Sequence, residues 1–186
     1  ASFELHNKCW APLTIERSAY EKGLSRQLTI LAVKPDDTLA GQIALIRTNL
    51  SSDELLKKKY AELFSPDVSD RNGKALVCVS ICRADYRAKE IPAVSRIPDV
   101  AEVEKYLPDD PVYKFHQKPK GGGAGAELAG LIPGGRPEDT SSLGYNMLLK
   151  YPEPAHVVVD ENAPVSNQLI EVVLLLASDL GIPDVY

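Results

Sequence analysis

The chain has 186 residues, of which 44% are hydrophobic and 25% charged, and its formal net charge is −5. This composition excludes an intrinsically disordered chain, and the length predicts one domain, spanning residues 1–186, with a single core. The acidic balance argues against nucleic acid as a partner, because phosphate contacts need a basic surface. No stretch approaches the roughly 20 apolar residues of a membrane span, and Ala1–Glu4 lacks the order of a signal peptide. We therefore expect a cytoplasmic protein without a membrane partner.

The chain contains three cysteines, Cys9, Cys78 and Cys82. They form no CxxC pair and have no histidine at zinc-ligand spacing, which argues against a disulfide framework and against a zinc site. We expect reduced thiols, with Cys9 in a packed N-terminal helix and the other two in an apolar strand, and we expect no metal. Asp109 and Asp110, which are flanked by prolines, predict a turn rather than an acid/base pair.

The first half of the chain alternates helical and strand patterns. Ser51, followed three residues later by Glu54, forms a capping box, and apolar residues then recur at helical spacing until Pro66. Ala75–Cys82 is apolar almost without a break, which is typical of a central strand covered on both faces. The expected elements are, in order, a short helix between Thr14 and Gly23, an antiparallel hairpin of Leu28–Val33 with Leu39–Ile46, a helix at 52–64 and the strand Ala75–Cys82.

The second half of the chain ends in a long apolar helix. Asn167–Asp179 carries apolar residues nearly all round, so we expect it to be buried on several sides. The glycine-rich run Gly121–Gly125 is not followed by a Lys-Ser/Thr pair, and we interpret it as a turn rather than a phosphate loop. The other expected elements are a helix at Val100–Leu107, a brief strand or helix start at Val112–His116, strands at Leu128–Ile132, Tyr145–Tyr151 and His156–Val159, and a last strand within Gly181–Tyr186.

These patterns together predict an α/β fold with a mixed, mostly antiparallel central sheet and helices on both faces. We expect Leu28–Val33, Leu39–Ile46 and Ala75–Cys82 to lie side by side in this sheet. The Asn167–Asp179 helix should pack across the central strands, because a helix that is apolar on both sides needs a sheet face to cover it.

A series of local motifs resembles one group of domains. Tyr113-Lys114-Phe115-His116 is followed by Gly125-Ala126-Glu127-Leu128 and then by a stretch that contains Arg136-Pro137-Glu138-Asp139. These segments resemble GNAT-like domains of the acyl-CoA N-acyltransferase superfamily, among them the domains that load starter units in curacin-type polyketide synthases. The resemblance is specific around residues 112–151 and looser elsewhere. It implies a GNAT-like fold, and the order of the segments leaves open a circular permutation or one repeat of a tandem array.

The resemblance also implies a loop that binds the pyrophosphate of CoA. In the family this loop has the form Gln/Arg-x-x-Gly-x-Gly/Ala and leads into the N-terminus of a helix, which favours anions. The nearest counterpart here has Glu161 in place of Gln/Arg, Pro164 in place of the first glycine and Ser166 in place of the second. Proline has no N–H to donate and glutamate repels a diphosphate. We therefore expect no normal CoA binding and no cofactor; if one binds, the resemblance places it at Ser166 and Asn167.

Two residues occupy positions that the resemblance implies to be catalytic. Curacin-type loading domains use a threonine and a histidine near the thioester, and Ser95 and His116 fall at those positions. An ordinary histidine pKa near 6.5 would let His116 move protons at neutral pH, although a structural histidine bonded to a backbone carbonyl is the other interpretation. We expect Arg96, His116 and Tyr145 to contact a ligand in a cleft between Ala75–Cys82 and Val112–His116.

Two functions from different classes remain open. The first is a degenerate GNAT-like domain that binds a small molecule without normal CoA binding. A weaker resemblance links this domain to dinoflagellate luciferin-binding protein and implies that the affinity for the ligand changes between about pH 6 and 8 as His116 titrates. The alternative is an acyl-thioester decarboxylase or S-acyltransferase of polyketide loading type, with acyl-CoA or an acyl-carrier thioester as its substrate. The expected partners are a small-molecule ligand, neighbouring repeats or a carrier protein, and a second copy of the chain by exchange of an element.

Overall fold

The computed structural model describes residues 1–11, 13–85, 103–117, 125–152, 159 and 161–186. Short 3₁₀ segments at Tyr60–Phe64, Leu107–Asp109 and Thr140–Ser142 supplement the regular elements. The helices are α1 (Ser2–Trp10), α2 (Arg17–Leu24), α3 (Ser52–Leu55), α4 (Val103–Tyr106), α5 (Pro111–Gln117) and α6 (Val165–Asp179), and the strands are β1 (Leu28–Val33), β2 (Leu39–Thr48), β3 (Ala75–Arg83), β4 (Glu127–Ile132), β5 (Asn146–Lys150) and β6 (Asp184–Val185).

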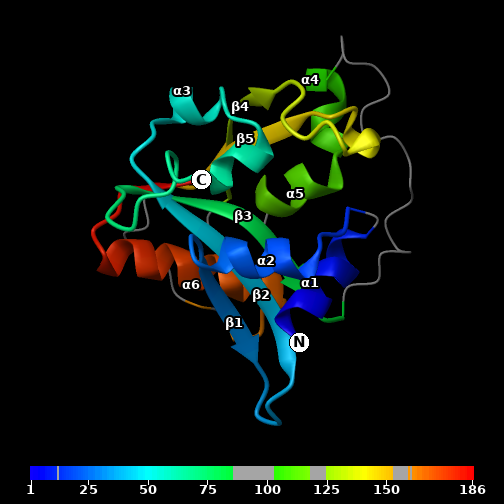
Figure 1. The fold of residues 1–186 in the computed structure, drawn as a ribbon, viewed down its shortest axis with the longest axis vertical. Coiled ribbons are helices and arrows are strands. Elements are labelled where there is room, and N and C mark those ends of the chain that lie inside the picture. The colour runs from blue at the N-terminus through cyan, green and yellow to red at the C-terminus, as the bar shows by residue number, and fades with distance from the viewer. Residues whose placement is uncertain (12, 86–102, 118–124, 153–158, 160) are drawn as a thin grey trace.

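Four strands form the main sheet in the order β1-β2-β3-β6 (Figure 1). The pairs β1/β2 and β2/β3 are antiparallel, whereas β6 runs parallel to β3. The strands β4 and β5 form a separate antiparallel hairpin. The Tyr151 N–H, just past β5, donates to the Val185 carbonyl at 2.9 Å, so the end of the hairpin continues the hydrogen bonding beyond β6.

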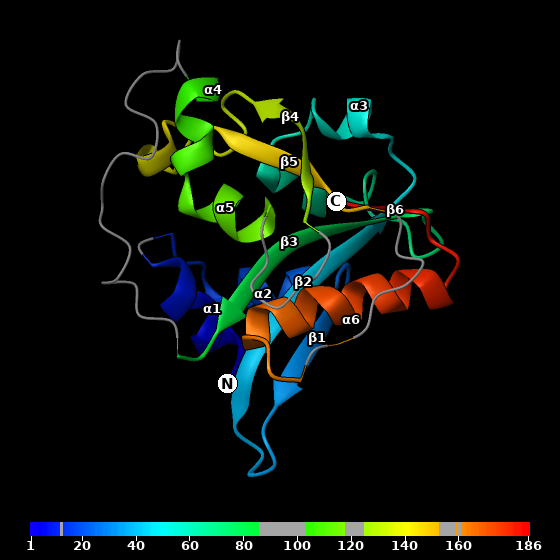
Figure 2. The ribbon, with the colours of Figure 1, turned by 180° about the vertical axis from the view of Figure 1, so that it is seen from behind.

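Both faces of the central strands are covered. Helix α6 lies across one face and α1 with α2 across the other, while α4, α5 and the β4–β5 hairpin gather at one end of the molecule (Figures 1 and 2). On the α6 side, Leu45 and Leu76 of the sheet pack against Leu174 and Ala177 of the helix, and all four are at most 1% exposed. This arrangement confirms the predicted α/β fold and the position of the long helix.

Sequence and structure differ in the segment at 52–64, where we expected one helix. The helix α3 ends after Leu55, and Lys59 is extended, with φ −74° and ψ 155°, before the 3₁₀ segment Tyr60–Phe64. A second capping interaction explains the break, because the Glu62 carboxylate accepts a hydrogen bond from the Lys59 N–H at 2.6 Å. The Val112–His116 segment, left open as strand or helix, is helical, and the strand expected at His156–Val159 falls mostly outside the described residues.

A β-bulge in β3 decides which side chains face which helix. Ala44 of β2 pairs with Ser80, but the next residue, Leu45, pairs with Cys78. The extra residue reverses the alternation of side chains. Cys78 therefore packs into the core on the α6 side, whereas Ser80 faces α1 and accepts a hydrogen bond from its Trp10 indole at 2.9 Å. Cys82, two residues beyond Ser80, lies on that same α1 side, with its Sγ 3.7 Å from the Ser80 hydroxyl.

A glycine sets how closely α6 approaches the sheet. A Cβ atom at Gly41 of β2 would lie 2.8 Å from Val165 Cγ1 and 2.9 Å from the Cys82 carbonyl oxygen. We expect Gly41→Ala to lower the free energy of unfolding by about 1–3 kcal/mol, because the helix or the strand must shift to admit the methyl group. Urea denaturation measures this change.

The matched control is Gly23→Ala in α2, where an added Cβ meets no atom within 4 Å. This change should leave stability unaltered or raise it by up to about 1 kcal/mol, because alanine is the better helix former. Equal losses of stability in the two variants would contradict the close approach of α6 at Gly41.

Candidate functional site

A histidine and a tyrosine meet where α5 approaches the end of β5. His116 Nδ1 lies 2.5 Å from the Tyr151 hydroxyl, and the two rings are arranged edge to face with their centroids 6.1 Å apart. The Ala126 N–H donates to the His116 carbonyl at 2.8 Å, which fixes α5 against the start of the hairpin. The two side chains come from segments 35 residues apart, so only the tertiary fold brings them together.

Helix α5 begins at a buried aspartate. Asp110 Oδ1 accepts hydrogen bonds from the N–H groups of Val112 and Tyr113 at 2.8 and 2.9 Å. Its neighbour Asp109 instead forms an exposed ion pair with Lys114 at 2.8 Å. Both interactions are local, which agrees with the prediction of turn chemistry at this pair, and the Asp110 cap orients the helix that presents His116.

Burial keeps both members of the His116–Tyr151 pair uncharged at neutral pH. Removal from water lowers the pKa of His116 to about 4 and raises the pKa of Tyr151 above its ordinary value. The expectation that His116 titrates between pH 6 and 8 is therefore wrong, because the sequence could not show how deeply its imidazole is buried. The other interpretation, a structural histidine bonded to a backbone carbonyl, also needs correction, because the partner of His116 Nδ1 is the side-chain hydroxyl of Tyr151.

Cys78 of β3 belongs to the same buried cluster as Tyr151 and Phe115. Burial raises the pKa of the Cys78 thiol to about 12, so almost none of it is thiolate at neutral pH. Cys78 is a wall of this site rather than a nucleophile, in agreement with its assignment to an apolar strand.

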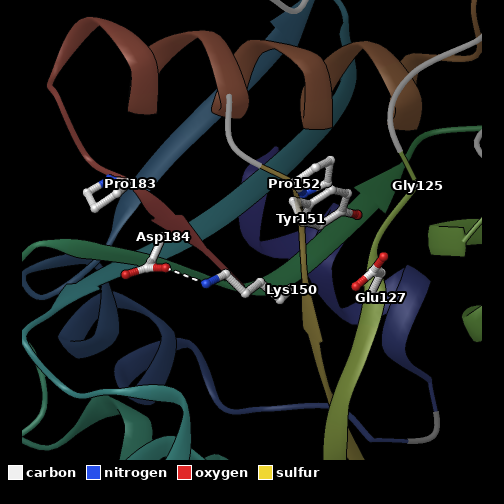
Figure 3. Close-up of a pocket in the computed structure, with 7 residues that line it drawn as sticks. All are labelled: Gly125, Glu127, Lys150, Tyr151, Pro152, Pro183 and Asp184. Atoms are coloured by element: carbon white, nitrogen blue, oxygen red, sulfur yellow. Dashed lines mark hydrogen bonds and ion pairs between the residues drawn. The ribbon is translucent and has the colours of Figure 1, made fainter. Parts of the chain in front are cut away.

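A cavity of about 370 Å³ opens beside Tyr151 (Figure 3). Its wall carries charges of both signs, and Lys150 Nζ forms an ion pair with Asp184 Oδ1 at 2.7 Å. The sequence provided no signal for this cavity, because its wall comes from three segments that only the fold assembles. The lining residues are Gly125 and Glu127 beside and in β4, Lys150, Tyr151 and Pro152 at the end of β5, and Pro183 and Asp184 at β6.

The N-terminus of α6 carries an unpaired polar side chain. Asn167 is 3% exposed, and its Nδ2 has no hydrogen-bond partner among the described residues. Pro164 precedes the helix as its N-cap, so its missing N–H does not remove a donor from the first turn. The N–H groups of Asn167 and Gln168 donate to the Pro164 carbonyl at 2.8 and 3.1 Å. The role of Ser166 and Asn167 in binding a cofactor stays a prediction.

The remaining predicted site residues have different outcomes. Ser95 and Arg96 lie outside the described residues. Tyr145 lies in the turn before β5, where its N–H donates to the Ser142 carbonyl at 3.0 Å, and among the described residues it has no hydrogen bond or ring contact with His116. Tyr145 does not line the cavity of Figure 3, and its expected contact with a ligand stays a prediction. The described residues also contain no group of three or more His, Cys, Asp or Glu side chains that could hold a metal ion, and no helix long and apolar enough to span a membrane.

The pH dependence of stability tests the buried state of His116. Below about pH 6.5 the imidazole binds a proton in the unfolded chain, but in the folded protein only below about pH 4. Stability is therefore intact above pH 6.5 and falls as the pH is lowered toward 4, by roughly 3 kcal/mol from this group. Urea denaturation at several pH values should show a shallower acid loss of stability for His116→Gln than for the wild type; equal slopes for the two proteins would contradict the buried neutral state.

Two solved structures share this fold. A GNAT-like decarboxylase, GphF, in complex with isobutyryl-CoA is 18% identical over 78% of this chain and 90% of its own, with a TM-score of 0.50. The loading GNATL domain of CurA from Lyngbya majuscula is 17% identical over 80% of this chain and 89% of its own, with a TM-score of 0.54. No protein family and no curated protein matches the sequence. At these identities the comparison concerns the fold alone.

Proposed function

From the GNAT-like fold of this chain, which resembles curacin-type loading domains, we propose that it binds an acyl thioester next to His116 and Tyr151 and decarboxylates or transfers the acyl group. The thioester would be carried by CoA or by a carrier protein. The fold of a decarboxylase and of a polyketide loading domain supports this choice of reaction class. The observation that carries the proposal is the part-buried hydrogen bond between His116 and Tyr151.

The pair can supply one oriented, neutral hydrogen-bond donor. When the Tyr151 hydroxyl donates to His116 Nδ1, the proton of the neutral imidazole is held on Nε2. A neutral imidazole donor in a dry site stabilises an oxyanion that develops from a carbonyl group. His116 is the proposed catalytic residue, and Tyr151 is the residue that positions it.

Decarboxylation of a malonyl-type thioester shows what this donor would do. The bond between the carboxylate carbon and the α-carbon breaks, CO₂ leaves, and the electron pair moves into the thioester carbonyl to form an enolate. The enolate oxygen accepts the hydrogen bond from His116 Nε2–H, and the α-carbon then takes a proton from water. The donor acts most strongly on the enolate, so it lowers the barrier rather than only tightening binding.

The start of α6 favours binding of the polar part of CoA or of a carrier-protein arm, whereas Glu161 opposes it. The Asn167 side-chain amide and the N-terminal end of the α6 dipole favour a phosphate or an amide carbonyl. Glu161, exposed three residues before Pro164, adds a negative charge there. We therefore propose that free CoA thioesters bind more weakly than micromolar and that a carrier-linked thioester is the better substrate.

Non-catalytic binding of a small molecule in the same cleft is the second candidate. The replacement Glu161 favours it, because its negative charge weakens the site for a CoA pyrophosphate. Native mass spectrometry of protein purified from its source separates the two functions: a retained ligand without an acyl thioester supports the binder, and an acyl-CoA or a carrier adduct supports the enzyme.

A turnover assay tests the enzymatic proposal. We expect CO₂ release and conversion of malonyl- or methylmalonyl-thioesters, presented on CoA and on a carrier protein, when products are followed by mass spectrometry. Tyr151→Phe should lower kcat by about 10- to 100-fold with little change in KM, because it releases the orientation of His116 without removing the donor. The matched control is Tyr113→Phe on the same helix, whose hydroxyl accepts a hydrogen bond from Gln117 at 3.3 Å and from no other described residue. Absence of turnover on both carriers, or equal effects of the two substitutions, would contradict the proposal.

A further inference from the structure

We propose that Cys9 and Cys82 form a reversible disulfide when the protein meets a hydroperoxide, so that the junction of α1 and β3 is a redox modification site. The two cysteines lie 73 positions apart in the sequence and form no recognisable motif. The fold places both thiols on the face of the sheet that α1 covers. This inference is independent of the proposed function, because neither thiol belongs to the His116–Tyr151 site.

Three consecutive residues of α1 hold that helix in register with the end of β3. Lys8 Nζ donates to the Ala84 carbonyl at 2.6 Å, Cys9 Sγ lies 3.4 Å from the Arg83 carbonyl oxygen, and Trp10 Nε1 donates to Ser80 Oγ at 2.9 Å. Cys82 lies between these three contact points on β3. The helix cannot slide along the strand without breaking them, so Cys9 is held against Cys82.

The bulge in β3 leaves Cys9 with one cysteine partner. Cys78 packs into the cluster on the α6 side of the sheet, whereas Cys82 lies near Ser80 on the α1 side, with 3.7 Å between Ser80 Oγ and Cys82 Sγ. All three cysteines are free thiols in the structure. Oxidation within one molecule therefore leads to a single pairing, with Cys78 left reduced.

The surroundings of the two thiols give them different reactivities. The hydrogen bond with the Cys82 thiol is the largest cause that lowers the pKa of Cys9, to about 7, and the Arg83 backbone and the charges of Lys8 and Arg83 act in the same direction. Cys9 is half-buried, so a small oxidant can reach it. Cys82 is 2% exposed, and the interaction with Cys9 together with burial raises the pKa of its thiol. Cys9 is therefore the attacking thiolate and Cys82 the resolving thiol.

The chemistry balances in two steps. The Cys9 thiolate attacks one oxygen of the hydroperoxide, the O–O bond breaks, and Cys9 becomes a sulfenic acid while an alcohol, or water from hydrogen peroxide, leaves. Cys82 then attacks the Cys9 sulfur, the S–OH bond breaks, and water leaves with the proton of the Cys82 thiol. One peroxide is reduced and two thiols are oxidised, and a dithiol reductant reverses the reaction by thiol–disulfide exchange.

Peptide mapping tests the pairing on the wild-type protein. After a small excess of hydrogen peroxide and alkylation of the remaining thiols, trypsin should release Cys9–Arg17 joined to Ala75–Arg83, with the mass of two hydrogen atoms missing and one alkylated cysteine. Both Cys78 and Cys82 lie in the second peptide, so Cys78→Ser is the matched variant that assigns the bond. It should give the same cross-linked pair, and Cys82→Ser should give none and accumulate a Cys9 sulfenic acid that dimedone traps.

Thermal unfolding reports whether the bond fits the fold. The oxidised wild type should melt at least about 5 °C above the reduced protein, because the bond constrains a long loop of the unfolded chain. The shift should vanish with dithiothreitol, and Cys78→Ser should keep it. Three fully alkylated cysteines after peroxide, a bond to Cys78, a bond between two molecules, or a lower melting temperature on oxidation would each overturn the proposal. The peptide mapping uses the wild-type protein, so it shows whether the disulfide forms even where a variant fails to fold.

Discussion

Burial of β2 and β3 on both faces is the constraint on which the rest of the structure depends. A polar group in such strands must find a hydrogen-bond partner without water. On the α1 face, Gln42 receives a hydrogen bond from the Ser2 hydroxyl, and Ser80 receives one from the Trp10 indole. These bonds attach the N-terminal helix to the sheet. On the other face, the absence of a side chain at Gly41 lets α6 approach the sheet closely. The pair β2 and β3 therefore determines where both α1 and α6 lie.

The stretch that most resembles GNAT-like loading domains contributes to packing. The Arg136 guanidinium lies between two aromatic rings, 4.7 Å from the centroid of Trp10 and 4.4 Å from that of Tyr60. The Tyr60 N–H donates to the Gly135 carbonyl at 2.7 Å, and the Tyr60 hydroxyl donates to the Val79 carbonyl at 3.0 Å. Stacking of arginine on rings favours this arrangement. The motif thus joins the loop between β4 and β5 to α1 and β3, which explains why it indicates the fold more directly than the chemistry.

The candidate site and the cysteine pair lie on opposite sides of β3. Tyr151, Cys78 and Phe115 share the core on the α6 side, whereas Cys9 and Cys82 lie under α1. The bulge in β3 creates this division, since without it Cys78 and Cys82 would point to the same face. The Cys82 carbonyl also borders Gly41, next to Val165 at the start of α6. The strand β3 therefore contacts both α1 and α6 and borders the region where a thioester is proposed to bind.

The sequence by itself determined the elements whose patterns are local: the hairpin, the apolar strand β3, the long helix α6 and the turn at Asp109 and Asp110 all follow from periodicity and turn chemistry within a few residues. The motif resemblance added the GNAT-like fold and named His116, Ser166 and Asn167 as candidate site residues. Only the tertiary structure decided the partners, because contacts between distant segments leave no periodic signal. It placed Tyr151 against His116, set the pKa of that histidine through burial, and used a one-residue bulge to separate Cys78 from Cys82. Burial depth and register are properties of the assembled sheet, and no single segment encodes them.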